Sequence, residues 1–139
     1  MAENRMTFEE LEARMTVAPF HRWLGLKLLS MDDGGIQVAV TWREEFAVNP
    51  DKHYTHGGIL ATVIDVAADY ALAARFGRPV PTVDLRVDYH RAAMPGDLRV
   101  EARPIRIGST FSSAEAYVYD RDDKLVASGR GVYYSALPK

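Results

Sequence analysis

The segment from His56 to Phe76 places two carboxylates on a predicted helix that is otherwise almost entirely apolar. At about 100° per residue, the side chains of Thr62, Asp65 and Asp69 fall within roughly 60° of one another around the helix axis. An unpaired carboxylate is costly to bury. This polar stripe predicts a reaction site, a structural ion pair with an arginine across a subunit interface, or a simple contact with solvent.

The start of the same helix offers a second chemical group. Gly57 and Gly58 follow His56, and the free N–H groups at a helix start lie at the positive end of the helix dipole. Glycine lets a ligand approach the backbone closely, so both N–H groups could receive a developing oxyanion. Gly57 and Asp65 are eight residues apart, which places them near one line along the helix. We therefore expect attack on a carbonyl group.

The four histidines add little further chemistry. His53 and His56 are spaced like possible metal ligands, but no cysteine and no further histidine cluster supports them. His21 and His90 have no motif around them. The sequence therefore predicts no metal site and no cofactor of the protein's own.

The composition is that of an ordinary folded domain. The chain has 139 residues, of which 47% are hydrophobic and 26% are charged, and we expect one domain over residues 1–139. The formal net charge of −2 provides no basic field for a phosphate backbone. We therefore expect no nucleic-acid partner.

Three features favour a cytoplasmic location. The chain contains no cysteine, so a disulfide framework is excluded and a reducing compartment is allowed. The N-terminal segment MAENRMTFEELEARM carries acidic residues and no continuous apolar run, unlike a secretory signal. The most apolar stretch, Ile59 to Ala74, is shorter than a membrane span and contains Asp65 and Asp69. We expect no transmembrane segment and no membrane partner.

Two helices and six strands are predicted. A capping-box pattern at Thr7 starts a short helix over Phe8–Met15, and Gly77 ends the long helix over Gly57–Phe76. Alternating apolar and polar residues predict strands at Leu24–Met31, Ile36–Trp42, Val83–Tyr89, Leu98–Ile107, Phe111–Tyr119 and Leu125–Tyr134. The alternation in the fourth strand changes parity at Pro104, which predicts a bulge there.

This order of elements predicts an α+β fold in which one antiparallel sheet curves around a buried helix. The strand Val83–Tyr89 is expected to be half-buried, because apolar and charged residues alternate along it. A six-stranded sheet has two edges, and pairing an edge with a second copy would cover it and enlarge a small core. We therefore expect a homodimer.

The chain also contains the runs HGGILATVIDVAADYAL, PTVDLRVDYHRAAMPGD and RIGSTFSSAEAYVYDRDDKLVASGRGVYY. Together they resemble the hotdog-fold acyl-CoA thioesterases of the phenylacetate-pathway (PaaI-like) type, over residues 20–135. The resemblance implies a hotdog fold. It also implies a homodimer with its active site at the subunit interface, or a homotetramer formed from two such dimers.

The resemblance further implies roles for individual residues. The helix carboxylate, here Asp65, acts as a base or a nucleophile, the N–H of Gly57 binds the thioester carbonyl, and Asn49 assists. His56 helps to hold the carbonyl or the loop. Thr82 stands where relatives often carry a Ser or Thr that positions water opposite the carboxylate, across the dimer interface.

Other residues are expected to contact the substrate. Gly58 lies beside the main N–H donor, and Asp69 adds a second acid where many relatives have a hydroxyl or an apolar residue. Arg106, Ser109 and Thr110 lie in a segment that often contacts the coenzyme A moiety in relatives. The loop that precedes the long helix is one residue longer than is common in this family.

Hydrolysis of a small or aromatic acyl-CoA thioester is the function that these residues favour. Gly57 would polarise the carbonyl, and Asp65 would deliver water or attack directly. Coenzyme A enters as part of the substrate. Two alternatives remain open: a non-catalytic acyl-CoA binding module, and a hotdog-fold enoyl thioester hydratase or dehydratase in which His56 and Asp65 cooperate.

Overall fold

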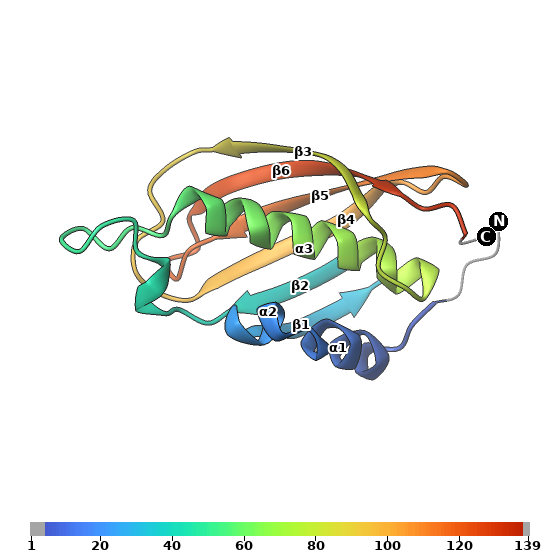
Figure 1. The fold of residues 1–139 in the computed structure, drawn as a ribbon, viewed down its shortest axis with the longest axis horizontal. Coiled ribbons are helices and arrows are strands. Elements are labelled where there is room, and N and C mark those ends of the chain that lie inside the picture. The colour runs from blue at the N-terminus through green and yellow to red at the C-terminus, as the bar shows by residue number, and fades with distance from the viewer. Residues whose placement is uncertain (1–4, 138–139) are drawn as a thin grey trace.

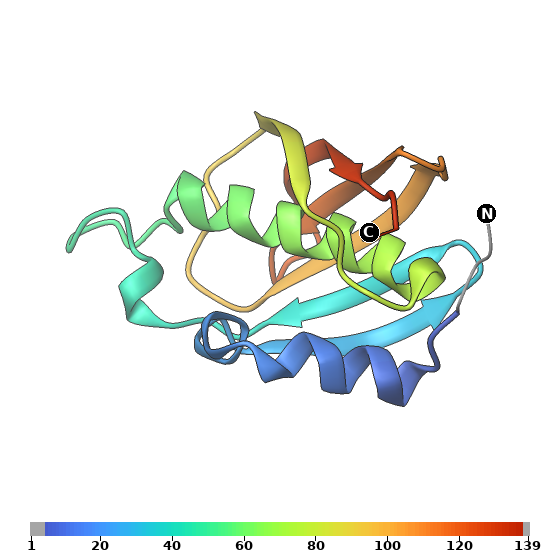
Figure 2. The ribbon, with the colours of Figure 1, turned by 45° about the vertical axis from the view of Figure 1, so that its right-hand side comes forward.

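A six-stranded antiparallel sheet curves around one long helix (Figures 1 and 2), in a computed structural model that describes residues 5–137. The strands are β1 (Leu26–Asp32), β2 (Gly35–Val40), β3 (Thr82–Tyr89), β4 (Leu98–Arg106), β5 (Phe111–Tyr119) and β6 (Leu125–Tyr134). Their order across the sheet is β1-β2-β4-β5-β6-β3. The helices are α1 (Phe8–Val17), α2 (Pro19–Trp23) and α3 (Gly57–Phe76), with a short 3-10 helix η1 (Glu44–Phe46). This arrangement confirms the predicted α+β hotdog fold.

The first element of the described chain is α1, which begins at the predicted capping box. The Thr7 hydroxyl accepts a hydrogen bond from the N–H of Glu10, and the Glu10 carboxylate accepts one from the N–H of Thr7. Pro19 then starts the separate helix α2, which was not predicted because five residues show too little periodicity. Residues 1–4, where no signal sequence was expected, lie outside the described residues.

The strands confirm the predicted positions to within two residues at each end. The hairpin of β1 and β2 is antiparallel, as expected from its turn residues. The register between β4 and β5 shifts between Pro104 and Arg106, which confirms the predicted bulge. The buried side chains of β4 and β5 face α3, and these include Val100, Ala102, Ala114, Ala116 and Val118.

Helix α3 forms the centre of the fold. It ends at Gly77, whose φ of 78° lies in the left-handed region, and the Gly77 N–H donates to the Ala73 carbonyl. Among the described residues, α3 is the helix with the length and apolar composition of a membrane span. However, 56% of that stretch is buried within the protein, as in the core helix of a globular domain.

The two edges of the sheet differ in how far they are covered. At β1, the Glu12 carboxylate of α1 accepts a hydrogen bond from the Leu28 N–H (2.6 Å), and the strand is bulged after Leu28. At the other edge, Val83 and Tyr89 of β3 are 56% and 55% exposed. The predicted half-burial of β3 holds in the middle of the strand, where Leu85 and Val87 are partly buried against the core, but not at its two exposed ends.

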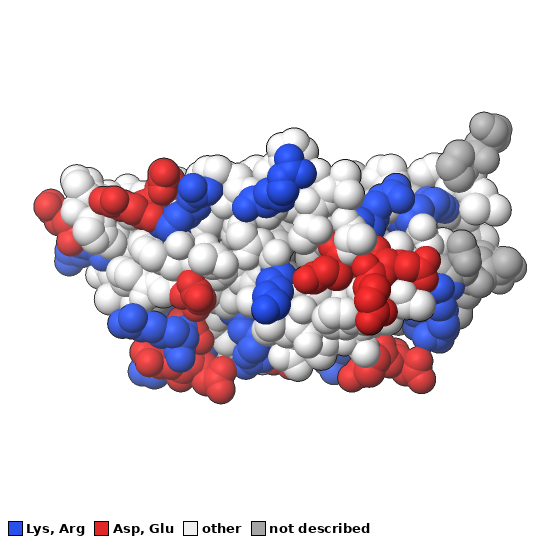
Figure 3. Space-filling model, turned by 90° about the horizontal axis from the view of Figure 1, so that it is seen from below, with Lys and Arg blue, Asp and Glu red and all other residues white. Residues whose placement is uncertain are grey.

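Charged side chains of both signs are mixed on the surface. Lys and Arg alternate with Asp and Glu on the face that Figure 3 shows. On the sheet, Arg99 donates to both Glu101 (2.7 Å) and Asp123 (2.9 Å). Such pairs neutralise the arginines locally.

Candidate active site

The start of α3 is built around His56. Its Nδ1 accepts a hydrogen bond from the Gly58 N–H (2.9 Å), and its backbone carbonyl accepts one from the N–H of Ile59 (2.9 Å). His56 is thus the N-cap of the helix. Within residues 5–137, the N–H of Gly57 has no hydrogen-bond acceptor. Of the two predicted backbone donors, Gly57 remains available to a ligand and Gly58 is used by the cap.

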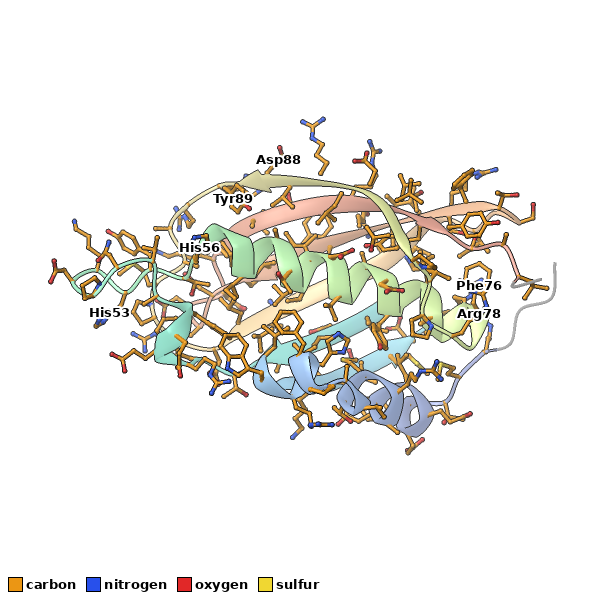
Figure 4. The ribbon with its side chains drawn as sticks, viewed as in Figure 1. His53, His56, Phe76, Arg78, Asp88 and Tyr89 are labelled. Atoms are coloured by element: carbon orange, nitrogen blue, oxygen red, sulfur yellow. The ribbon has the colours of Figure 1, made fainter. Side chains whose placement is uncertain are left out.

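Tyr89, the last residue of β3, fixes this first turn from the side of the sheet. Its hydroxyl donates to the Gly57 carbonyl (2.9 Å), and a Cβ on residue 57 would lie 3.2 Å from its ring. Figure 4 shows Tyr89 beside His56 at the start of α3, with Phe76 and Arg78 at the opposite end. A glycine at position 57 therefore lets the ring lie directly against the helix start.

Asp65 lies in the middle of α3, where it faces β3 and β6. Its Oδ1 accepts hydrogen bonds from the Thr82 hydroxyl (2.9 Å) and from the Tyr133 hydroxyl (3.0 Å). In the described part of the chain no arginine pairs with this carboxylate, so the ion pair considered as an alternative is not formed within one chain. Thr82 was expected opposite the carboxylate across a subunit interface. It contacts Asp65 of its own chain, because β3 starts alongside α3, and its expected role across the interface stays a prediction.

Asp69 lies one turn further along α3 and has a different partner. Its Oδ1 accepts a hydrogen bond from the backbone N–H of Val80 (2.9 Å), in the segment that leads into β3. Burial is the main cause that raises the pKa of Asp69 to about 7, the charge of Asp65 adds to the rise, and the Val80 hydrogen bond opposes it. The carboxylate thus ties the end of α3 to the start of β3, and its predicted contact with substrate stays a prediction.

Gly57 and Asp65 are well separated along the helix. Eight residues at 1.5 Å per residue place them about 12 Å apart along the helix axis. Direct attack by one group on a carbonyl that is hydrogen-bonded to the other requires a separation of roughly 7 Å. The prediction relied on the two groups being aligned along one helix. That alignment does not bring the Gly57 N–H and the Asp65 carboxylate of one chain to the same carbonyl.

Asn49 lies in the loop of residues 47–55, which projects from the body of the fold at the left of Figure 1. Its side-chain oxygen accepts hydrogen bonds from the N–H groups of Asp51 (3.0 Å) and Lys52 (2.7 Å). The amide therefore shapes the loop tip and makes no hydrogen bond to Asp65 in the described chain. The structure does not bring Asn49 to the carboxylate of its own chain.

The predicted coenzyme A contacts lie at the turn between β4 and β5. Arg106, Ser109 and Thr110 are all exposed there, and the Arg106 guanidinium donates to the Phe111 carbonyl (3.2 Å). In Figure 1 this turn is at the right, whereas α3 starts at the left. Within one chain these residues are therefore at the far end of the molecule from Gly57.

Two shallow concavities lie on the face of the sheet that points away from α3. One is lined in part by Gln37, Glu101 and Tyr117, and the other by Arg86 and Arg130. Neither includes the start of α3 or the Asp65 carboxylate. Over residues 5–137, no group of three or more His, Cys, Asp or Glu side chains is placed to hold a metal ion.

Two tyrosines at this site were missed from the sequence. Tyr133 contacts the Asp65 carboxylate, and Tyr89 contacts the Gly57 carbonyl. Neither stands out in the sequence, since a tyrosine at a strand position ordinarily packs in the core or at an interface. The available signal was the run GRGVYY, in which Gly131 precedes Tyr133 by two residues on the same face of β6.

Comparison with known proteins identifies the class. Residues 53–127 match the Thioesterase superfamily, which is more than half of the 139 residues. The matched region contains the start of α3, Asp65 and Thr82. The chain therefore belongs to the thioesterase superfamily, a class of thioester hydrolases.

Three proteins of this class illustrate how similar the chain is to its relatives. A thioesterase-superfamily protein of known crystal structure is 49% identical, with a TM-score of 0.89, covering 91% of this chain and 96% of that chain. The medium/long-chain acyl-CoA thioesterase YigI of Salmonella typhimurium is 28% identical over 131 residues, covering 83% of this chain and 84% of YigI. The PaaI protein of Escherichia coli has a TM-score of 0.81 at 23% identity, with 91% of each chain covered, and so shares the fold. These matches confirm the predicted PaaI-like resemblance.

Proposed function

We propose that this protein hydrolyses acyl-CoA thioesters with a small or aromatic acyl group, giving the free acid and coenzyme A. One observation carries the proposal. The half-buried Asp65 carboxylate is held by the hydroxyls of Thr82 and Tyr133, and no cation among residues 5–137 pairs with it. A carboxylate that is fixed in place and unpaired with a cation is suited to act as a base or as a nucleophile.

The complete site requires two copies of the chain. Gly57 and Asp65 are about 12 Å apart along one helix, which is too far for direct attack on a shared carbonyl. The uncovered edge of β3 can pair with the β3 edge of a second copy about a twofold axis. In such a homodimer the two α3 helices run antiparallel, and Gly57 of each subunit approaches Asp65 of the other. Two such dimers would form the homotetramer.

The proposed reaction then uses one group from each subunit. The Gly57 N–H donates to the thioester carbonyl oxygen and stabilises the negative charge that develops on it. Asp65 either removes a proton from an attacking water or attacks the carbonyl carbon itself, forming a mixed anhydride that water hydrolyses. The carbon–sulfur bond breaks in both cases, and coenzyme A leaves as its thiolate, which takes up a proton. We also propose a cytoplasmic location for this reaction, with which the cysteine-free composition is compatible.

Release of free thiol from a panel of acyl-CoA esters tests the proposal. The panel should span short, medium, long and aryl acyl groups, since the YigI relatives are named for medium and long chains. We expect thiol release with the highest kcat/KM on a short or aryl ester. Binding of all esters without thiol release would indicate a binding module, and loss of the conjugated absorbance of an enoyl ester would indicate a hydratase.

Substitution of the central carboxylate tests its role. Asp65→Asn keeps the shape of the side chain but removes the charge, and should lower kcat by roughly 10² to 10⁴. Asp33→Asn is the matched control, because Asp33 is exposed on the β1–β2 hairpin with a surface partner, Arg5. It should leave kcat unchanged. Turnover by Asp65→Asn at the wild-type rate would exclude Asp65 as the catalytic group.

A further inference from the structure

The hydrogen bonds around Asp65 are concentrated on one of its two carboxylate oxygens. Tyr133, fully buried in β6, shares its single hydroxyl proton between Oδ1 (3.0 Å) and the backbone carbonyl of the same Asp65 (3.1 Å). The Thr82 hydroxyl donates to Oδ1 as well (2.9 Å). No hydrogen bond from residues 5–137 reaches Oδ2. The two oxygens of this carboxylate are therefore not equivalent.

This asymmetry determines the orientation of the carboxylate. The terminal torsion of an aspartate side chain is soft, so an unrestrained carboxylate samples a broad range of orientations. Two donors that converge on Oδ1 restrict that rotation, and the contact of Tyr133 with the Asp65 backbone fixes the phenol relative to the helix itself. Oδ2 is then left as the oxygen that can meet a water or a carbonyl carbon.

Tyr133 reaches Asp65 because of a glycine on its own strand. A Cβ on Gly131 would overlap the hydroxyl and the ring of Tyr133. The ring can therefore lie back along β6 toward α3 only while residue 131 has no side chain. Burial and the neighbouring charge of Asp65 raise the pKa of the Tyr133 phenol, so it stays protonated and remains a hydrogen-bond donor.

We propose that Tyr133 is a positioning residue for the reaction, which holds Oδ1 of Asp65 so that Oδ2 alone faces the substrate, and that Gly131 provides the space it needs. The proposal rests on the proposed hydrolytic function of Asp65. Tyr133 itself does not contact the substrate. Its effect on the reaction passes entirely through the carboxylate.

Removal of the phenol hydroxyl is the first test. Tyr133→Phe keeps the buried ring and should lower kcat by roughly 10- to 100-fold, the range expected for a misoriented reacting group, with KM changed less than about twofold. Gly131→Ala keeps the Tyr133 hydroxyl but displaces the Tyr133 ring, so it should lower kcat as well. Tyr70→Phe is the control, because Tyr70 is also buried but makes no hydrogen bond to Asp65. It should keep wild-type kcat.

A double-mutant cycle separates positioning from general destabilisation. If Tyr133 acts through Asp65, Tyr133→Phe should cause no further loss of kcat in an Asp65→Asn background. An equal fold loss in both backgrounds would overturn the proposal, as would wild-type kcat in Tyr133→Phe. If the wild-type protein is active and Asp65→Asn has the same kcat, the result would instead contradict the proposed function of Asp65.

A crystal structure of Tyr133→Phe gives a test that does not depend on activity. We expect the Asp65 carboxylate to occupy a different or a second orientation once one of its two donors is lost. A carboxylate unchanged in orientation would overturn the positioning role, even if the enzyme's substrate were still unidentified.

Discussion

Asp65 and Asp69 stand one turn apart on α3 but receive different hydrogen bonds. Hydroxyl groups of Thr82 and Tyr133 hold Asp65, whereas a backbone N–H, that of Val80, holds Asp69. Burial raises the pKa of Asp69 to about 7. The two acids therefore have different environments: Asp69 connects α3 to the segment before β3, and Asp65 is the acid to which the proposed function gives the reaction.

Asp69 should make the stability of the protein depend on pH. Burial raises its pKa from the ordinary 3.8 to about 7, so folding favours the protonated acid. The free energy of unfolding should therefore fall as the pH rises from about 4 to about 7, by on the order of 4 kcal/mol in total. Asp69→Asn still offers an oxygen to the Val80 N–H but no longer titrates. Urea unfolding at several pH values should show a flatter pH dependence for this variant.

An exposed acid provides the comparison for that measurement. Asp33→Asn removes a carboxylate on the β1–β2 hairpin, whose side chain is 96% exposed, and should keep the pH dependence of the wild type. If Asp69→Asn retained the full wild-type dependence between pH 4 and pH 7, the assigned burial of Asp69 would be wrong.

Among the elements, α3 depends at its start on the side chain of His56. His56→Ala removes the acceptor of the Gly58 N–H and should lower the free energy of unfolding by about 1 kcal/mol. His56→Asn should recover most of that loss, because asparagine is a preferred N-cap residue. Urea unfolding of both variants checks the expectation.

Turnover of the same two variants separates capping from chemistry. If His56 acts only as the cap, His56→Asn recovers kcat together with stability. If His56→Asn were as unstable as His56→Ala, loss of the N-cap hydrogen bond would not explain the lower stability of the alanine variant. A stable asparagine variant with low kcat would place the imidazole in contact with the substrate.

The bounds of a helix or strand could be predicted from the sequence where its regular pattern of apolar residues extends over many positions. Helix α3 and strands β5 and β6 have their predicted bounds, because 9 to 20 residues of regular pattern separate period 3.6 from period 2. Helix α2 was missed, since it is five residues long. The position of β3 at the sheet edge was also not predicted, because strand order depends on non-local pairing that alternation within one strand does not specify.

Site residues close in sequence were easier to predict than those brought together by packing. The helix start and Asp65 share one helix, so their spacing on α3 could be read directly. Tyr133 is 68 residues from Asp65, and its contact requires the register of β6 against α3 together with the space at Gly131. Thr82 was identified, but its contact with Asp65 of the same chain depends on where β3 begins beside α3.

At the scale of the whole molecule, the two sheet edges favour one mode of association. Helix α1 covers β1 through Glu12, whereas β3 is left with an open edge and with exposed Val83 and Tyr89. The single chain also leaves Gly57 and Asp65 too far apart for direct attack. Both features are accounted for if β3 strands pair in a twofold dimer whose active sites combine Gly57 of one subunit with Asp65 of the other.

Subunit mixing with Gly57 variants tests this central claim most directly. Gly57→Pro deletes the N–H at the first helical position, where proline is tolerated, and His56 already has the extended backbone that proline requires before it. It should lower kcat by roughly 10² to 10³. Gly57→Ala is the matched control, because it keeps the N–H and its Cβ, 3.2 Å from the Tyr89 ring, requires only a small shift of that ring. It should retain most of the activity.

Gly57→Pro and Asp65→Asn should then be unfolded and refolded together. Each mixed dimer would contain one site with both groups intact, so statistical exchange should restore about a quarter of wild-type activity from two nearly inactive parents. A refolded mixture no more active than its parents would contradict a site shared between subunits.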